Sequence, residues 1–230
     1  FKNIFDLAII GAGPAGMACS ATLARKGLEV ALLDEQATPG GQIYRNITRT
    51  TPRQRSILGE DYRFGLGLVE EYGDAAVEYL PGSRVWQVDP NGSVYFSRDG
   101  VSGRVRGAYV AICTGAMERP VPFPGWTLPG VMTCGGMSNL YKDSGLVPTD
   151  TVVLAGSGPL LWLVAEHLLA LNVRVAAILD TTPLSNSFAA LKRMPAAVRR
   201  ADFLFKGVKM IGSVYNDARR KKVPIYRNVK

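Results

Sequence analysis

The sequence of 230 residues holds one histidine and three cysteines, and this scarcity excludes several kinds of chemistry. Cys19, Cys113 and Cys134 share no C-x-x-C spacing, which argues against a zinc site, a disulfide framework and a redox-active dithiol. His167 stands alone, so neither a histidine-based metal site nor a Ser-His-Asp triad is expected, and we predict no metal. We expect ordinary buried thiols, a histidine on a helix face, and redox chemistry carried by a bound cofactor.

Long apolar runs and amino-terminal targeting signals are also lacking. The longest apolar stretch, residues 160–171, is interrupted by Glu166 and His167, so no transmembrane segment is expected. An apolar strand begins almost at once, which leaves no room for a signal peptide and favours a cytoplasmic protein. Phe1 is not an initiator methionine, which indicates a trimmed amino terminus.

The formal net charge of +8 is unevenly distributed. Lysines and arginines crowd the chain after residue 181, where Asp202 and Asp217 are the acidic residues. Such a segment can bind nucleic acid or an acidic membrane. No nucleic-acid motif accompanies it, so we favour a solvated helix face or a contact surface for another part of the protein.

The most informative motif is a G-x-G-x-x-G turn between an apolar strand and an Ala-rich helix. Gly11 permits the sharp turn, Gly13 lets backbone approach a pyrophosphate, and Gly16 allows close helix–strand packing. Pro14 suits a first helical turn, where phosphates meet free N–H groups. A second apolar strand over residues 30–33 ends at Asp34, at the distance where a carboxylate takes ribose hydroxyls. We predict a β-α-β unit that binds an adenine dinucleotide.

The segments after this unit predict a ligand-facing loop and a β-meander. Gly40 and Gly41 would let backbone approach a planar ligand, which Gln42 and Arg45 can hydrogen-bond. Residues 46–60 are expected to form a surface excursion and residues 61–72 a helix. Strand-like runs over 76–80 with 84–89, 93–98 and 104–113 are separated by close turn signals and predict the meander. Residues 116–130 are proline-rich and predict an extended linker.

A second unit of the same type begins near residue 151. A strand over 151–155, a helix over 162–171 and a strand over 173–179 surround a turn at Gly156 and Gly158 and end at Asp180. Leu161 stands where the third small residue belongs and should push the helix from the strand. A site for NAD(P) or another adenine nucleotide here competes with a purely structural role. A helical pattern over 188–222 and a strand over 223–229 follow, and we divide the chain into domains at 1–120, 121–150 (connecting) and 151–230.

These landmarks resemble the two-dinucleotide-domain flavoproteins, the family of thioredoxin reductase. More narrowly, residues 33–36, 39–45, 114–126, 128–133 and 154–161 resemble a subgroup. It comprises the B subunit of hydrogen cyanide synthase, the A subunit of opine oxidases and the α subunits of D-hydroxyproline dehydrogenases. The resemblance implies an α/β fold: a three-layer, Rossmann-like FAD/NAD(P)-binding domain with a β-meander, and a second, incomplete domain. The family continues beyond residue 230, so truncation is expected and retention of FAD is left open. Lacking C-x-x-C, the chain does not carry over the disulfide-reductase reaction.

The resemblance implies an FAD-binding subunit of a multi-subunit dehydrogenase or oxidase that acts on the C–N bond of a small amino acid or opine-like amine. Implied partners are a second flavoprotein and a small iron–sulfur subunit, with peripheral association to the membrane electron-transport chain. Two alternatives remain: an NAD(P)H-dependent flavin reductase and a non-catalytic nucleotide-binding scaffold. No residue is assigned as a general base. The implied FAD contacts are Gly11, Gly13, Pro14, Ala15 and Gly16 for the pyrophosphate, Asp34 for the ribose, Glu35, Gln36 and the Val85 backbone for adenine, Gly41, Gln42 and Arg45 towards the flavin, and Thr114 and Gly115 at the pyrophosphate crossing.

Overall fold

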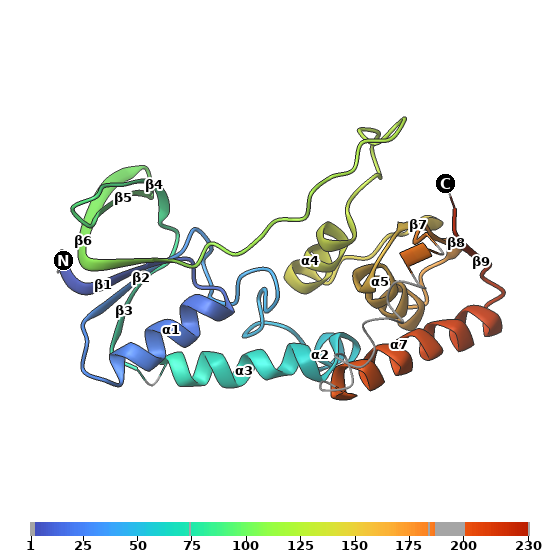
Figure 1. Ribbon diagram of the computed structural model, residues 1–230, viewed down its shortest axis with the longest axis horizontal. Helices are drawn as coiled ribbons and strands as arrows, with labels where there is room; N and C mark the ends of the chain where they lie inside the picture. Colours follow the sequence, from blue (N-terminus) through green and yellow to red (C-terminus); the bar gives the residue numbers. More distant parts are fainter. Residues whose placement is uncertain (1–2, 74, 184, 187–200, 230) are drawn as a thin grey trace. The chain divides into compact units, whose positions relative to one another are not determined.

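The computed structural model describes residues 3–73, 75–183, 185–186 and 201–229. It divides into two compact units, residues 1–119 and residues 120–230. Figure 1 shows the elements of both, and each unit is described by itself below. None of the helices in the described ranges is long and apolar enough to cross a membrane.

Unit 1 is built on one six-stranded sheet in the order β3-β2-β1-β6-β5-β4. Strands β3, β2, β1 and β6 run parallel, whereas β6, β5 and β4 form an antiparallel meander. The predicted first β-α-β unit is confirmed, because helix α1 connects β1 to its parallel neighbour β2. The elements are β1 (Ile4–Ile10), α1 (Pro14–Ala24), β2 (Val30–Leu33), α2 (Pro52–Leu58), α3 (Glu60–Gly73), β3 (Val77–Leu80), β4 (Arg84–Val88), β5 (Ser93–Arg98) and β6 (Val101–Ile112).

The parallel strands of unit 1 are buried on both faces. Leu7 and Ile9 of β1 pack with side chains of α1 and α3, while Ala8 and Ile10 pack with those of the meander. All four residues of β2 are buried, which explains their uninterrupted apolar run. Helices, parallel strands and meander therefore form the three layers that the sequence predicted.

Two expectations for unit 1 are wrong. Residues 46–60 are no simple surface excursion: they contain α2, which Thr51 begins with a capping box to Gln54, and Ile47 and Thr50 are buried. Strand β3 is not part of the meander, because it pairs in parallel with β2. Turn signals mark where a strand ends, but they do not specify which strand it pairs with.

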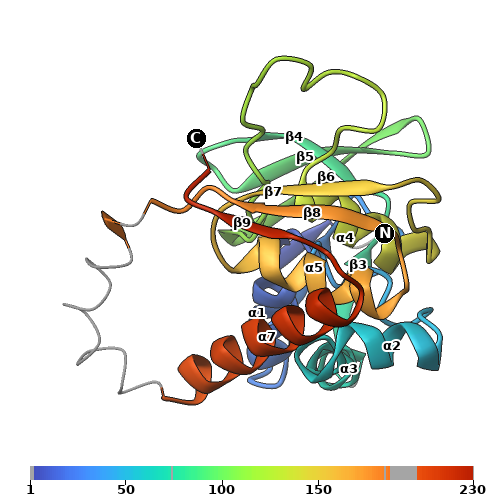
Figure 2. The ribbon, with the colours of Figure 1, turned by 90° about the vertical axis from the view of Figure 1, so that its right-hand side faces the viewer.

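Unit 2 contains the second β-α-β unit and confirms that prediction. Strands β7, β8 and β9 are parallel and adjacent in that order, and Figure 2 shows them side by side with α5 and α7. The rings of Trp162 and Tyr215 stack at 5.8 Å between their centroids, which joins α5 to α7. The elements are α4 (Cys134–Ser144), β7 (Val152–Gly156), α5 (Pro159–Ala170), β8 (Val175–Asp180), α7 (Ala201–Arg220) and β9 (Ile225–Arg227).

The second half of the expected connecting segment, residues 121–150, contains a helix that the sequence analysis did not predict. Helix α4 lies there, capped by the Thr133 hydroxyl, which accepts the N–H of Gly136, and ended by Gly145 in the left-handed region. The predicted helix over 188–222 is found as α7, while residues 187–200 lie outside the described residues.

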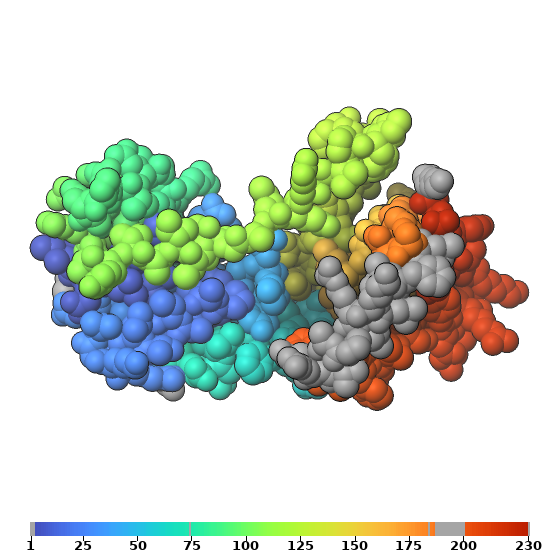
Figure 3. Space-filling model, viewed as in Figure 1, coloured from blue at the N-terminus to red at the C-terminus, as the bar shows by residue number. Residues whose placement is uncertain are grey.

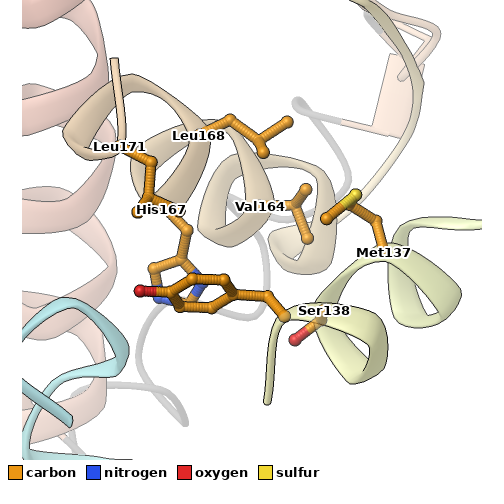
Figure 4. A pocket seen from close by; sticks show the side chains of 7 residues that line it. Met137, Ser138, Val164, His167, Leu168 and Leu171 are labelled. Atoms are coloured by element: carbon orange, nitrogen blue, oxygen red, sulfur yellow. The ribbon is translucent and has the colours of Figure 1, made fainter. Parts of the chain in front are cut away.

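His167 lies in a helix as predicted, and its side chain is buried. It faces a cavity of about 10 Å³ between α4 and α5, together with Met137, Ser138 and Tyr141 of α4 (Figure 4). The residue is 8% exposed, and burial, with a smaller effect of the nearby Lys142 charge, lowers its pKa to about 4. His167 is therefore a neutral core residue at pH 7.

We expect the free energy of unfolding to fall as the pH falls from 6.5 towards 4. In this window the unfolded chain protonates its imidazole, whose ordinary pKa is 6.5, while folded His167 stays neutral. The lowered pKa of His167 reduces the free energy of unfolding by at most about 3 kcal/mol at low pH. Urea unfolding at pH 7 and pH 5 measures the effect. Because His167 is the single histidine, a His167→Leu chain should lose this dependence, and an unchanged slope would contradict the assignment.

Candidate functional site

The glycine turn between β1 and α1 is packed too tightly for side chains at two positions. A Cβ on Gly11, which has φ of +101°, would lie 2.5 Å from the carbonyl oxygen of Cys113. A Cβ on Gly16 would lie 1.9 Å from the carbonyl oxygen of Gly11. The end of β6 therefore lies directly against the turn, and with it Thr114, whose Cα is 3.3 Å from the same built Cβ of Gly11.

The amino terminus of α1 leaves its backbone donors without a side-chain cap. Gly13 is the N-cap residue, Pro14 follows it, and the first turn contains no acidic side chain. The first N–H groups of a helix have no partner within the helix, and the helix dipole favours an anion beside them. This end of α1 is suited to hold a diphosphate.

The segment at Gly40 and Gly41 lies against the same turn. The Gly40 N–H donates to the Ala12 carbonyl at 2.8 Å, and a Cβ on Gly41 would lie 2.9 Å from the Gly13 Cα. Tyr44 anchors this segment to α3, where a Cβ on Gly65 would lie 2.5 Å from its ring. The exposed Gln42 is thereby held close to the turn.

Asp34 lies at the end of β2 and is 7% exposed. Its carboxylate accepts the N–H of Ala12, in the glycine turn, and the N–H of Gln36 at 2.6 Å. Burial raises the pKa of Asp34, although these two N–H groups act in the opposite direction. The carboxylate thus ties the turn to the end of β2 and keeps acceptor capacity for a further donor.

Three buried side-chain polar atoms among the described residues lack a hydrogen-bond partner: Arg45 Nε, Tyr79 Oη and Ser83 Oγ. All three belong to the surroundings of Asp34. The Ser83 N–H donates to the Asp34 carbonyl at 2.7 Å, and the Asp34 charge adds to burial in raising the pKa of Tyr79. Unpaired buried polar atoms are rare in folded proteins, so their gathering here fits a polar ligand.

Two interactions place Arg45 beside the end of β2. Its Nη1 donates to Gln36 Oε1 at 3.1 Å, and its charge acts on the pKa of Asp34, so the guanidinium lies beside the end of β2. The family resemblance implies a place for Arg45 towards the flavin, and this stays a prediction. Sequence reasoning missed Tyr79 and Ser83, which follow no motif spacing.

The remaining predicted residues surround this arrangement. Ala15, Glu35, Thr114 and Gly115 are exposed, and Val85 lies in the edge strand β4, partly buried against the meander core. The three cysteines are partly exposed, so the expectation of buried thiols is wrong. Among the described residues, no group of three or more His, Cys, Asp or Glu side chains is placed to hold a metal ion.

The second glycine turn repeats the spacing of the first but not its packing. Gly158 has φ of +85°, whereas Gly13 has φ of −72°, and Leu161 is buried at 2% exposure where the first unit has Gly16. Asp180 corresponds to Asp34: it ends β8, is 8% exposed, and accepts the N–H of the second residue after it, Thr182, at 3.0 Å. The acidic residue is thus retained while the turn is changed.

The sequence matches a known protein family and is similar to subunits of known oxidases and synthases. The family model described as "Pyridine nucleotide-disulphide oxidoreductase" matches residues 5–219. The A subunit of opine oxidase from Rhizobium meliloti (strain 1021) is 38% identical over 98% of this chain and 49% of its own length. Hydrogen cyanide synthase subunit HcnB of Pseudomonas aeruginosa is 36% identical over 89% of this chain and 44% of its own. The chain therefore spans about half the length of these relatives.

Two solved structures share the fold. L-proline dehydrogenase from P. horikoshii superposes with a TM-score of 0.63, at 19% identity over 78% of this chain and 36% of that one. Thioredoxin reductase from T. acidophilum superposes with a TM-score of 0.60, at 18% identity over 99% of this chain and 65% of that one.

Proposed function

The chain belongs to the pyridine nucleotide-disulphide oxidoreductase family, and on this basis we propose that it is the FAD-binding subunit of a multi-subunit oxidoreductase. The proposed enzyme oxidises the C–N bond of a small amino acid or opine-like amine. The observation that carries the proposal is the junction of three segments at one point: the α1 amino terminus, the Gly40–Gly41 segment and Asp34. The relatives from opine oxidase and hydrogen cyanide synthase support the reaction class.

In this proposal the chain's own residues bind and orient the cofactor. Backbone N–H groups at Gly13, Ala15 and Gly16 hold the diphosphate at the α1 amino terminus. Asp34 accepts from the ribose hydroxyls, and a carboxylate there disfavours a 2′-phosphate. Bound FAD would accept a hydride from the carbon of the C–N bond, whose C–H bond breaks, and the side chains of this unit cannot supply this chemistry. The remaining contacts are Glu35, Gln36 and the Val85 backbone at the adenosine end, Gly41, Gln42 and Arg45 towards the flavin, and Thr114 and Gly115 at the pyrophosphate crossing.

The second turn supports a nucleotide site less well than the first. Asp180 is suited to a ribose, but the changed backbone at Gly158 and the bulk of Leu161 alter the approach to a phosphate. We therefore propose at Gly156, Gly158 and Asp180 at most a second adenine-nucleotide site, and no NAD(P)H-dependent reduction of the flavin. A second flavoprotein and a small iron–sulfur protein are the proposed partners.

The full-length protein and its complex provide the test. We expect the purified complex to show a flavin absorption spectrum that an amine or amino acid bleaches under anaerobic conditions, whereas NADPH and NADH do not. Bleaching by NADPH or NADH alone would favour the flavin reductase. A colourless full-length complex that FAD does not reconstitute would favour the non-catalytic scaffold.

A further inference from the structure

The outer face of the meander in unit 1 presents an aromatic pair, of which Trp86 is exposed and Tyr95 is partly exposed. Trp86 of β4 and Tyr95 of β5 lie with ring centroids 5.5 Å apart, and Trp86 is 56% exposed. The register of β4 against β5 shifts between Val85 and Gln87, so Trp86 is the extra residue of a bulge. Val85 packs on the core, while the bulge lets Trp86 join Tyr95 on the other face.

Two arginines of β6 stand beside this pair. Arg104 is paired in register with Tyr95, and Arg106 with Ser93, so both lie on the outer face two residues apart. Both arginines are exposed. The Nε of Arg106 donates to the Asn91 carbonyl at 3.2 Å, and its two terminal nitrogens take no part in that hydrogen bond. In the described part of the chain, no carboxylate lies within 4.0 Å of either guanidinium.

The two acidic residues of the meander interact with other side chains. Asp89 accepts from the Gln87 side chain at 2.7 Å, and the Asp99 carboxylate lies 3.9 Å from Arg98 Nε in the turn between β5 and β6. The meander forms the blue-green to green upper part of unit 1 in Figure 3. Its outer face therefore combines apolar ring surface with positive charge that the unit does not neutralise.

We propose that Trp86, Tyr95, Arg104 and Arg106 form a docking surface for an acidic face of another protein subunit. Trp, Tyr and Arg are the residues that most often carry binding energy at protein interfaces, and guanidinium groups pair with carboxylates through two parallel hydrogen bonds. A second copy of this chain is a poor occupant, because the chain carries a net charge of +8 and two such faces would repel. This inference rests on the proposed function only in that the protein works in a complex.

The test uses the complex purified through a tag on the full-length chain. The binding partner is identified by mass spectrometry, purified, and titrated calorimetrically against the full-length chain. We expect the double charge reversal Arg104→Glu/Arg106→Glu to raise the Kd at least tenfold, and Trp86→Ala to do the same. Wild-type binding should weaken with added salt, and the charge-reversed chain should lose most of that salt dependence.

Matched variants separate docking from loss of folding. Lys26→Glu/Arg53→Glu changes the charge equally at exposed positions of unit 1, and Phe64→Ala removes an aromatic ring that is 68% exposed on α3. Both controls should bind like wild type, and all variants should keep the far-ultraviolet circular dichroism of wild type.

Several outcomes would overturn the docking surface. These are unchanged affinity in both meander variants, equal weakening in the controls, a chain that purifies with no other protein, and co-elution of RNA or self-association that depends on Arg104 and Arg106. Amine-dependent bleaching of the flavin is measured separately. If bleaching is absent while the meander variants still lose the partner, the proposed function fails and the docking surface stands.

Discussion

Replacing Gly16 with alanine is expected to leave the full-length protein without bound flavin and to lower its free energy of unfolding by about 3 kcal/mol. The new methyl group would lie 1.9 Å from the carbonyl oxygen of Gly11, a backbone atom that cannot move without opening the turn. Moving α1 away from β1 would withdraw the helix amino terminus from the diphosphate. Flavin absorbance per protein and urea unfolding measure the two effects.

Gly67→Ala is the matched control for this substitution. Gly67 also lies inside a helix of unit 1, but among the described residues nothing lies within 4 Å of its added Cβ. Alanine is a better helix former than glycine, so this variant should be as stable as wild type or more stable, by about 0.5–1 kcal/mol. Retained flavin in Gly16→Ala, or an equal loss in Gly67→Ala, would contradict the proposed role of the turn.

Asp34→Asn is expected to weaken FAD binding by about 10- to 100-fold, the equivalent of one or two charge-assisted hydrogen bonds. The carboxylate accepts the N–H groups of Ala12 and Gln36, and an amide offers only one oxygen to the two of them. The amide nitrogen would also face a backbone N–H, which shifts either the glycine turn or the residue that follows β2. Fluorescence titration of the flavin-free full-length protein with FAD measures the Kd.

Asp6→Asn provides the corresponding control. The Asp6 carboxylate also accepts a backbone N–H, that of Glu29 at 2.8 Å, but Asp6 is partly exposed and lies near the start of β1, at the opposite end from the glycine turn. The Kd of the Asp6→Asn variant for FAD should stay within about twofold of wild type, because a substitution at a distant site seldom changes binding at another. Equal Kd values for Asp34→Asn and wild type would remove Asp34 from the proposed site.

The local parts of the site could be predicted from the sequence because they depend on short-range rules. Gly11, Gly13 and Gly16 are spaced by the geometry of a strand, a turn and a helix, and Asp34 follows from the length of one β-α-β unit. The same rules locate the second turn and its acidic residue, Asp180. They also locate the meander, because Pro90-Asn91-Gly92 and Asp99-Gly100 separate its strands.

The parts that could not be predicted depend on contacts between segments. Helix α4 lies in a stretch with two adjacent glycines, and its α5 neighbour and the cap at Thr133 compensate for weak helix propensity. Strand β3 pairs with β2 rather than with its sequence neighbour β4, which no local pattern specifies. The pattern around His167 is typical of a helix, but only the packing of α4 makes its side chain buried.

The amino-acid order alone was enough to establish that two β-α-β units are present, that each contains a glycine turn, and that an acidic residue ends the second strand of each. These features follow from backbone sterics and from the period of apolar residues, which act over a few residues. The folded chain was needed to show that Arg45, Tyr79 and Ser83 gather around Asp34, that Gly41 packs on Gly13, and that Trp86 joins Arg104 on one face. Those placements depend on chain segments far apart in sequence, whose contacts are set by packing.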